Sequence, residues 1–284
     1  LAQELRHSLQ SNEISMCYQP IIDLTRSNVV GFEALMRWEH PERGRVPPDV
    51  FIPIAERSDF IFELGSFALR EALVQATSWQ PAAGQARKPY VTVNLSARQF
   101  HDPNLLSMIE KTLTASGLEP TRLLLEITES VALADIVGTT TVIERLGHLG
   151  VAIALDDFGT GYSSLSYLAF LRPRIIKIDR SFVSPPRENA YNDALLEAIV
   201  SLGKKMNMTV LAEGIETQGQ LERLLNLGCD LGQGYLFSPA VPAGEVAALL
   251  DKKASLWVKR PVLRTPRAPR QARTPPRLPR AKKV

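Results

Sequence analysis

Short apolar runs alternate with longer segments of helical length along most of this 284-residue chain. The runs are rich in Val, Ile and Leu, which is typical of strands buried on both faces of a parallel sheet. Seven or eight such strands, alternating with helices over about 250 residues, predict an α/β fold, a modified TIM (β/α)₈ barrel. Two runs, at residues 16–24 and 29–38, are separated only by a polar turn at 25–28. They predict a hairpin, so one strand of the barrel should run antiparallel to the others.

The predicted barrel occupies residues 14–250, within a domain that covers residues 1–258 and begins with a helix at 1–10. The other predicted strands lie at residues 90–95, 123–127, 151–155, 175–178 and 209–212, and a short last strand includes Gln233. Further helices are predicted at residues 50–55, 60–79, 104–115, 135–149, 189–206, 218–227 and 242–250.

The stretch at residues 151–165, VAIALDDFGTGYSSL, places two adjacent carboxylates, Asp156 and Asp157, at the end of a buried strand. Two carboxylates that leave water together repel each other unless a cation or a proton compensates. Gly159 and Gly161 then permit turns closed to other residues, and a serine can cap the following helix. Taken alone, the stretch is also compatible with a solvated, Asp-rich turn.

Other polar residues occupy the same kind of position, within or at the end of an apolar run. They are Glu33, Asn94, Glu126, Asp156, Asp157, Lys177, Asp179, Glu213 and Gln233. Because active sites of such barrels form at the carboxyl ends of the strands, these side chains are expected to meet at one mouth. Carboxylate and amide oxygens gathered there make a hard site of the kind that Mg²⁺ or Mn²⁺ prefers.

The paired aspartates indicate two metal ions bridged by the first carboxylate. Two ions about 4 Å apart suit phosphate-ester hydrolysis, because one activates water while both stabilise charge on the phosphoryl oxygens. Lys177 could hold the attacking water or meet the departing oxygen. The alternative, separate salt bridges in the core, needs about as many cations as carboxylates. Only Lys177, with Arg37 nearby, is available for that purpose.

Zinc and nucleophilic catalysis have little support in the sequence. The four histidines, His7, His40, His101 and His148, fall in predicted helices or loops rather than at strand ends. Zinc sites draw on clustered Cys and His, and a nucleophilic Ser or Cys requires a base placed beside it. The two cysteines cannot form a disulfide framework, which favours a reducing, cytoplasmic setting.

The net charge of +3 conceals an acidic body and a basic tail. Residues 259–284 contain ten Lys or Arg, six Pro and no acid, whereas residues 1–258 contain 23 basic and 30 acidic residues. The tail is expected to be extended, and it either contacts nucleic acid or anionic lipid or is a solvated extension. No apolar run approaches the length of a membrane span. The chain begins with Leu1 in a helix already under way, so we expect a piece of a longer protein.

Seven motifs together resemble the EAL-domain family of cyclic di-GMP phosphodiesterases, over residues 5–250. They are Glu33-Ala34-Leu35, Asn94-Leu95-Ser96, Glu126-Ile127-Thr128-Glu129, the run from Asp156 to Leu165, Lys177-Ile178-Asp179, Ala212-Glu213-Gly214-Ile215-Glu216 and Gln233-Gly234-Tyr235. The resemblance implies a barrel with one antiparallel strand that opens the cyclic dinucleotide to linear pGpG with two Mg²⁺ or Mn²⁺ ions.

The resemblance also implies a role for each matching residue. Glu33, Asn94, Glu126 and Asp156 would bind one ion, and Asp156, Asp157 and Glu213 the second. Lys177 would order the water, and Glu213 also matches a residue cast as the general base in this family. Gln19, Arg37, Gln233 and Asp179 match substrate-binding positions, with Arg37 as a phosphate fork. Glu129 and Glu216 match residues that position loops, Glu129 holding the loop that follows Asp157.

Three functions remain open at this point. The first is an active phosphodiesterase, since no catalytic match is lost. The second is a catalytically silent cyclic di-GMP receptor that signals through a partner. The third is nucleic-acid binding by the tail, for which no specific partner is expected. The resemblance further implies a homodimer and a sensor or GGDEF module in the parent chain, which could itself be tethered to a membrane.

Overall fold

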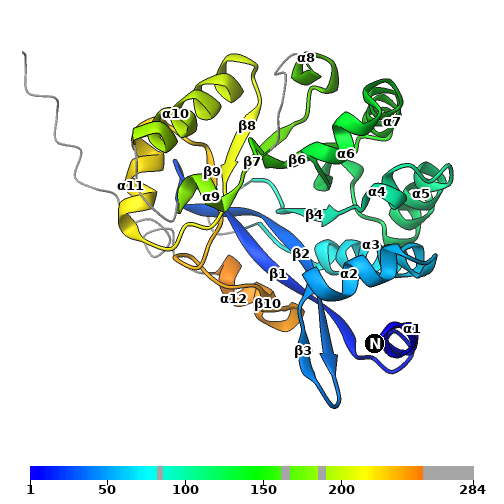
Figure 1. Cartoon of the computed structure of the whole chain (residues 1–284). Helices are drawn as coiled ribbons and strands as arrows, with labels where there is room; N and C mark the ends of the chain where they lie inside the picture. The colour runs from blue at the N-terminus through cyan, green and yellow to red at the C-terminus, as the bar shows by residue number, and fades with distance from the viewer. Residues whose placement is uncertain (82–85, 161–166, 185–189, 252–284) are drawn as a thin grey trace, which may run out of the picture.

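The computed structural model describes residues 1–81, 86–160, 167–184 and 190–251. Eight strands form a closed barrel surrounded by helices (Figure 1). Its strands are β1 Ile14–Asp23, β2 Asn28–His40, β4 Tyr90–Asn94, β5 Leu123–Thr128, β6 Ala152–Phe158, β7 Ile175–Ile178, β8 Thr209–Ala212 and β9 Leu231–Gly232. Two short strands, β3 Gly44–Val46 and β10 Val241–Pro242, extend the sheet beyond the barrel. The predicted basic tail, residues 259–284, lies outside the described residues.

The predicted antiparallel strand is β1. It pairs antiparallel with β2 and with β9, whereas β2 and the strands from β4 to β9 run parallel to one another. The pairing of β1 with both neighbours closes the barrel. The modified (β/α)₈ architecture predicted from the sequence is therefore confirmed.

The helices cover the outside of the barrel (Figure 1). They are α1 Ala2–Ser8, α2 Pro48–Glu56, α3 Phe60–Ser78, α4 Ala97–Phe100, α5 Leu105–Ser116, α6 Glu129–Ala134, α7 Ile136–His148, α8 Leu168–Leu171, α9 Arg180–Val183, α10 Ala190–Lys205, α11 Gln218–Leu227 and α12 Val246–Leu250, with 3₁₀ turns at Pro120–Arg122 and Ala243–Glu245. Within the described residues, no helix is both long and apolar enough to cross a membrane. The predicted helix at 242–250 is shorter than expected, because a 3₁₀ turn precedes α12.

The inside of the barrel has an apolar layer at the end where the parallel strands begin. It contains Ile21, Leu124, Ala154, Ile175, Leu211 and Leu231. Because side chains on a strand alternate between faces, the residue two positions further along also points inward. Those next inward positions are Gln19, Glu126, Asp156, Lys177, Glu213 and Gln233. The inward-facing side chains therefore change from apolar to polar over two positions along each strand, so that a polar mouth lies directly above an apolar floor.

Gly31 allows the ring of Tyr90 to lie against β2 inside the barrel. A Cβ atom at position 31 would lie 2.5 Å from the Tyr90 ring, closer than real contacts permit. Gly31→Ala should therefore lower the free energy of unfolding by about 1–3 kcal/mol, as overpacking typically does. Urea unfolding followed by circular dichroism measures the change.

Gly219→Ala is the matched control, because a Cβ atom at Gly219 in α11 meets nothing within 4 Å. It should leave stability unchanged or raise it by about 0.5–1 kcal/mol, the helix preference of Ala over Gly. Equal stability of the two variants would contradict the packing described for Tyr90.

Candidate active site

One buried ammonium lies at the centre of the polar mouth. Lys177 on β7 is 1% exposed, and its Nζ contacts four carboxylates. Nζ lies 2.8 Å from Glu213 Oε1, 3.0 Å from Asp156 Oδ2 and 3.7 Å from Glu33 Oε1, and it also donates a short hydrogen bond to Glu126 Oε2. Burial alone would lower the pKa of Lys177, but the surrounding carboxylates raise it well above its ordinary value. Lys177 is therefore charged at neutral pH.

Glu33 on β2 is held by amide donors as well as by Lys177. Its Oε1 accepts from Asn94 Nδ2 at 2.9 Å, and its Oε2 accepts from Gln233 Nε2 at 2.7 Å. Gln233 Nε2 also donates to Gln19 Oε1 at 3.0 Å. Burial opposes ionisation of Glu33, but the Lys177 charge and these hydrogen bonds outweigh it and lower the pKa. Glu33 is thus an ionised carboxylate in a preorganised setting.

Glu126 on β5 differs, because it is 1% exposed and one of its oxygens is unpaired. Its Oε1 has no hydrogen-bond partner among the described residues. Burial, followed by the charge of Glu33, raises the pKa of Glu126 well above its ordinary value, although Lys177 opposes the rise. A buried carboxyl oxygen without a partner is costly, so this atom marks a place where a further cation or proton would be stabilising.

The mouth of the barrel contains a cleft of about 230 Å³. Glu213, which follows β8, lines this cleft together with Asp156. Burial is the largest influence on its carboxyl and raises the pKa of Glu213 to about 7, against the opposing effect of Lys177. Glu213 can therefore exchange a proton near neutral pH.

An irregularity in β6 gives the adjacent side chains of Asp156 and Asp157 different exposure. The register between β6 and β7 shifts between Leu155 and Phe158, and Asp157 has a φ of 55°. This left-handed conformation is strained for a residue with a side chain, and such strain gathers at functional sites. Asp157 is consequently exposed at the rim. Partial desolvation, then the charges of Asp156 and Asp179, raise the pKa of Asp157.

Asp179, Glu129 and Glu216 lie around this core. Asp179 caps α9 by accepting from the Ser181 N–H at 3.0 Å. Buried Glu129, in the first turn of α6, accepts from the Gly159 N–H at 3.1 Å. This bond attaches α6 to the start of the loop after Asp157, most of which lies outside the described residues. Glu216 lines the cleft.

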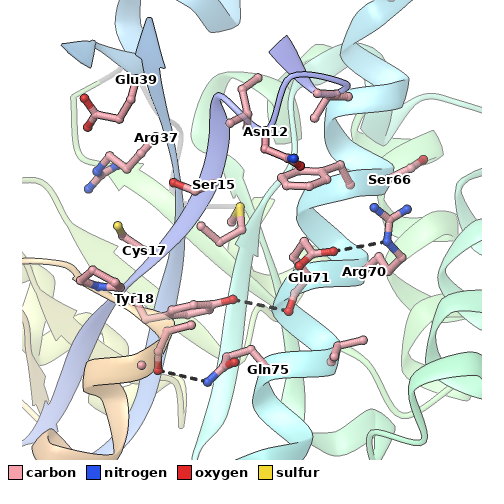
Figure 2. Close-up of a pocket in the computed structure, with 18 of the residues that line it drawn as sticks. Asn12, Ser15, Cys17, Tyr18, Arg37, Glu39, Ser66, Arg70, Glu71 and Gln75 are labelled. Carbon is pink, nitrogen blue, oxygen red and sulfur yellow. Dashed lines mark hydrogen bonds and ion pairs between the residues drawn. The ribbon is translucent and has the colours of Figure 1, made fainter. Parts of the chain in front are cut away.

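Arg37 lies apart from the cleft. It shares β2 with Glu33, but the two are four positions apart, a rise of about 13 Å along a strand. Its Nη1 donates to the Met36 carbonyl at 2.8 Å, and the residue lines a groove of about 1070 Å³ between β1 and α3. Figure 2 shows Arg37 on the strand side of this groove, across from Ser66 and Arg70 on α3. The structure therefore does not bring Arg37 together with the other predicted residues.

Two residues at the cleft, Arg180 and Tyr235, were assigned no role from the sequence, although Tyr235 belongs to the Gln233-Gly234-Tyr235 motif. Both line the cleft of about 230 Å³ that contains Glu33, Lys177 and Glu213. Tyr235 is 71% exposed, which is unusual for an aromatic side chain. Each follows a predicted site residue within two positions, and that adjacency was the available signal.

Among the described residues, no group of three or more His, Cys, Asp or Glu side chains is arranged so that it could hold a metal ion as it stands. The shared point of the carboxylates is taken by the Lys177 ammonium. The donor chemistry nevertheless fits a hard cation, because four carboxylates surround one ammonium and Glu126 retains an unpaired oxygen.

Sequence and structure comparisons agree on the family. The EAL domain model matches residues 2–240. The bifunctional diguanylate cyclase/cyclic di-GMP phosphodiesterase MucR of Pseudomonas aeruginosa is 39% identical over 248 residues, which are 87% of this chain and 36% of MucR. The oxygen sensor protein DosP of Escherichia coli is 39% identical over 258 residues, 91% of this chain and 32% of DosP.

The fold matches a solved structure of the PaMucR phosphodiesterase in complex with c-di-GMP. The TM-score is 0.82 at 39% sequence identity, over 86% of this chain and 98% of that one. This chain spans only 36% and 32% of the lengths of MucR and DosP, so the comparison concerns one part of those proteins. The chain therefore belongs to the EAL-domain family, as the family match over residues 2–240, the shared fold and the motifs at the barrel mouth all indicate.

Proposed function

We propose that the chain hydrolyses cyclic di-GMP to linear 5′-pGpG in bacterial second-messenger signalling, using two divalent ions. The observation that carries this proposal is the group of four carboxylates around Lys177 at the carboxyl ends of the strands. The likeness to MucR and to the PaMucR phosphodiesterase supports the substrate and the reaction.

Glu33, Asn94, Glu126 and Asp156 would hold one Mg²⁺ or Mn²⁺, and Asp156, Asp157 and Glu213 the other. When bound, such ions activate water and neutralise charge that develops on a transferring phosphoryl group. Hydrogen bonds from Asn94 and Gln233 already fix the Glu33 carboxylate, so little reorganisation is needed on that side.

The chain's own residues supply positioning and proton transfer. Lys177 provides a fixed positive charge at the cleft floor, which would orient the attacking water and stabilise phosphoryl oxygens. Glu213, 2.8 Å from Lys177, is placed to accept a proton from that water. Gln19 and Gln233, which are hydrogen-bonded to each other, form a polar wall that would orient the bound dinucleotide. Asp179, at the end of β7, would contribute to substrate binding as well. Arg37, four positions beyond Glu33 on β2, would contact a phosphate of the dinucleotide as a fork.

The test is incubation of the purified chain with cyclic di-GMP in Mg²⁺, in Mn²⁺ or in EDTA, followed by chromatography of the products. We expect pGpG with either ion and none in EDTA. Retained binding of cyclic di-GMP without pGpG in either ion would overturn hydrolysis in favour of a silent receptor.

We further propose that this part works in the cytoplasm, as a homodimer, within a parent chain that carries a sensor or GGDEF module. Cys17 and Cys229 are both free thiols, which suits a reducing compartment. MucR, whose printed name includes diguanylate cyclase, supports the fused module. Light scattering of the purified chain tests the dimer, and a mass near 31.4 kDa at micromolar concentration would contradict it.

A further inference from the structure

The opposite end of the barrel holds a second cavity, of about 1130 Å³. Its floor includes Val30, Tyr90, Ile175 and Leu231 from the inside of the barrel. Its walls come from the turn after β1, the segment before β4, the 3₁₀ turn before β5, and the connections into β7, β8 and β9. It therefore surrounds the end at which the parallel strands begin, and the apolar layer inside the barrel separates it from the carboxylates.

This cavity is basic in an otherwise acidic body. Six cations line it: Arg26, Arg87, Lys88, Arg122, Arg174 and Lys204. Only three acids do so, Asp23, Glu119 and Asp230, although acids outnumber bases over residues 1–258. A concentration of one sign of charge in a concave site focuses the field and attracts ions of the other sign.

The acids are largely engaged in local structure. Asp23 Oδ1 accepts from the Thr25 and Arg26 N–H groups, and Asp23 Oδ2 pairs with Arg26 at 2.9 Å. Asp230 Oδ2 accepts from the Val210 N–H at 2.9 Å. These two carboxylates therefore do not neutralise the remaining cations.

Three cations, Arg87, Lys88 and Arg174, make no side-chain hydrogen bond or ion pair with any described residue, and all three are exposed. Arg122 is buried, and among the described residues its side chain donates to the Ala76 and Pro89 carbonyls. Arg174 directly precedes Ile175 of the cavity floor, and both residues line the cavity with Tyr90.

We propose that this cavity binds a small molecule carrying two or more phosphoryl groups, such as a nucleoside polyphosphate. Arginine forks and a lysine match phosphate oxygens, and the volume is that of a small-ligand site. A concave site of this kind admits a compact anion, whereas a flat bilayer surface would not reach its floor. The proposal concerns a site separate from the carboxylate cleft and does not depend on hydrolysis there.

We would test the proposal by calorimetric titration of the whole chain with inorganic tripolyphosphate in EDTA. The buffer contains about 0.15 M salt, because screening at that ionic strength removes weak long-range attraction. We expect saturable binding with one site per chain. Arg174→Glu should weaken it at least about tenfold, the loss of one charge-assisted contact. The double variant Arg87→Glu/Lys88→Glu, on an exposed segment, should do the same. The free-state circular dichroism of both variants should be unchanged.

Lys111→Glu, on the exposed face of α5 and outside every cavity described, is the matched control and should bind like the parent. Absent binding, or equal weakening by Lys111→Glu and Arg174→Glu, would overturn the proposal. A titration repeated with saturating cyclic di-GMP should give the same affinity, and competition would overturn a separate site. If the parent chain sediments with anionic vesicles, the Arg174 variant does not, and neither binds tripolyphosphate, the cavity residues bind a membrane surface and the proposal is wrong.

Discussion

Replacing Lys177 with Met should lower the free energy of unfolding by about 3–5 kcal/mol at pH 8. The variant keeps the length and apolar stem of the side chain but removes the one ammonium that contacts Glu33, Glu126, Asp156 and Glu213. Burying a carboxylate without a counterion costs far more free energy than an intact ion pair contributes to stability. The destabilisation should therefore be among the largest for any single substitution. Urea unfolding measures it.

The loss should shrink as the pH falls. Burial raises the pKa of Glu126, and raises that of Glu213 from 4.5 to about 7. A carboxyl whose pKa is raised by folding binds its proton more tightly in the folded state, so stability falls as pH rises from 4.5 toward that raised value. Without Lys177 these values rise further, and the deficit of the variant should therefore grow from pH 5 to pH 8.

Lys111→Met is the control, because this exposed lysine on α5 makes no ion pair within the described residues. It should change stability by less than about 0.5 kcal/mol. Mn²⁺ should raise the melting temperature of the Lys177 variant more than that of the parent, since the oxygens no longer share an ammonium. Equal stability of the two methionine variants at pH 8 would contradict the central position of Lys177.

The second large effect is expected at Glu33. Glu33→Gln should reduce turnover of cyclic di-GMP about a thousandfold, because several kcal/mol of metal-dependent stabilisation are lost with one carboxylate. Gln is preferable to Ala at this position, since Asn94, Gln233 and Lys177 would all lose a partner on truncation. Gln keeps one of the two acceptor oxygens, so the melting temperature should fall less than in the Lys177→Met variant, and an unchanged circular dichroism spectrum separates loss of chemistry from loss of fold.

Glu39→Gln provides a matched control on the same strand. Glu39 is exposed and pairs with Arg45 at 2.7 Å, outside the barrel mouth. The same chemical change there should leave turnover within about twofold of the parent, because exposed ion pairs contribute little. Similar rates for the Glu33 and Glu39 variants would remove Glu33 from the site.

The barrel could be predicted because its strands obey simple periods. The runs that became β5 and β7 are apolar with a single charged residue each, Glu126 and Lys177, a pattern typical of a buried strand that ends at a polar mouth. The short helices α4, α6 and α9 were not predicted. They begin at capping residues such as Ser96, Thr128 and Asp179, and one helical turn is too short to leave a periodic signal.

Most residues of the candidate site could be predicted from the sequence, but the contacts between them could not. Strand ends identified the carboxylates, yet nothing in the sequence indicates that Lys177 would contact four of them at once. The positive φ of Asp157 likewise depends on the register shift against β7. Arg37 was assigned to the site because it matches a substrate-contacting position of the family, and a match of that kind does not indicate which groove the side chain lines.

The most direct measurement is the anomalous scattering of Mn²⁺ in crystals of the chain grown with that ion. We expect two peaks at the barrel mouth, one of them about 2 Å from oxygens of Glu33, Glu126 and Asp156. The Lys177 ammonium should have withdrawn from at least one of these carboxylates. Crystals that show no peak there, with Lys177 still in contact with all four carboxylates at saturating Mn²⁺, would contradict it.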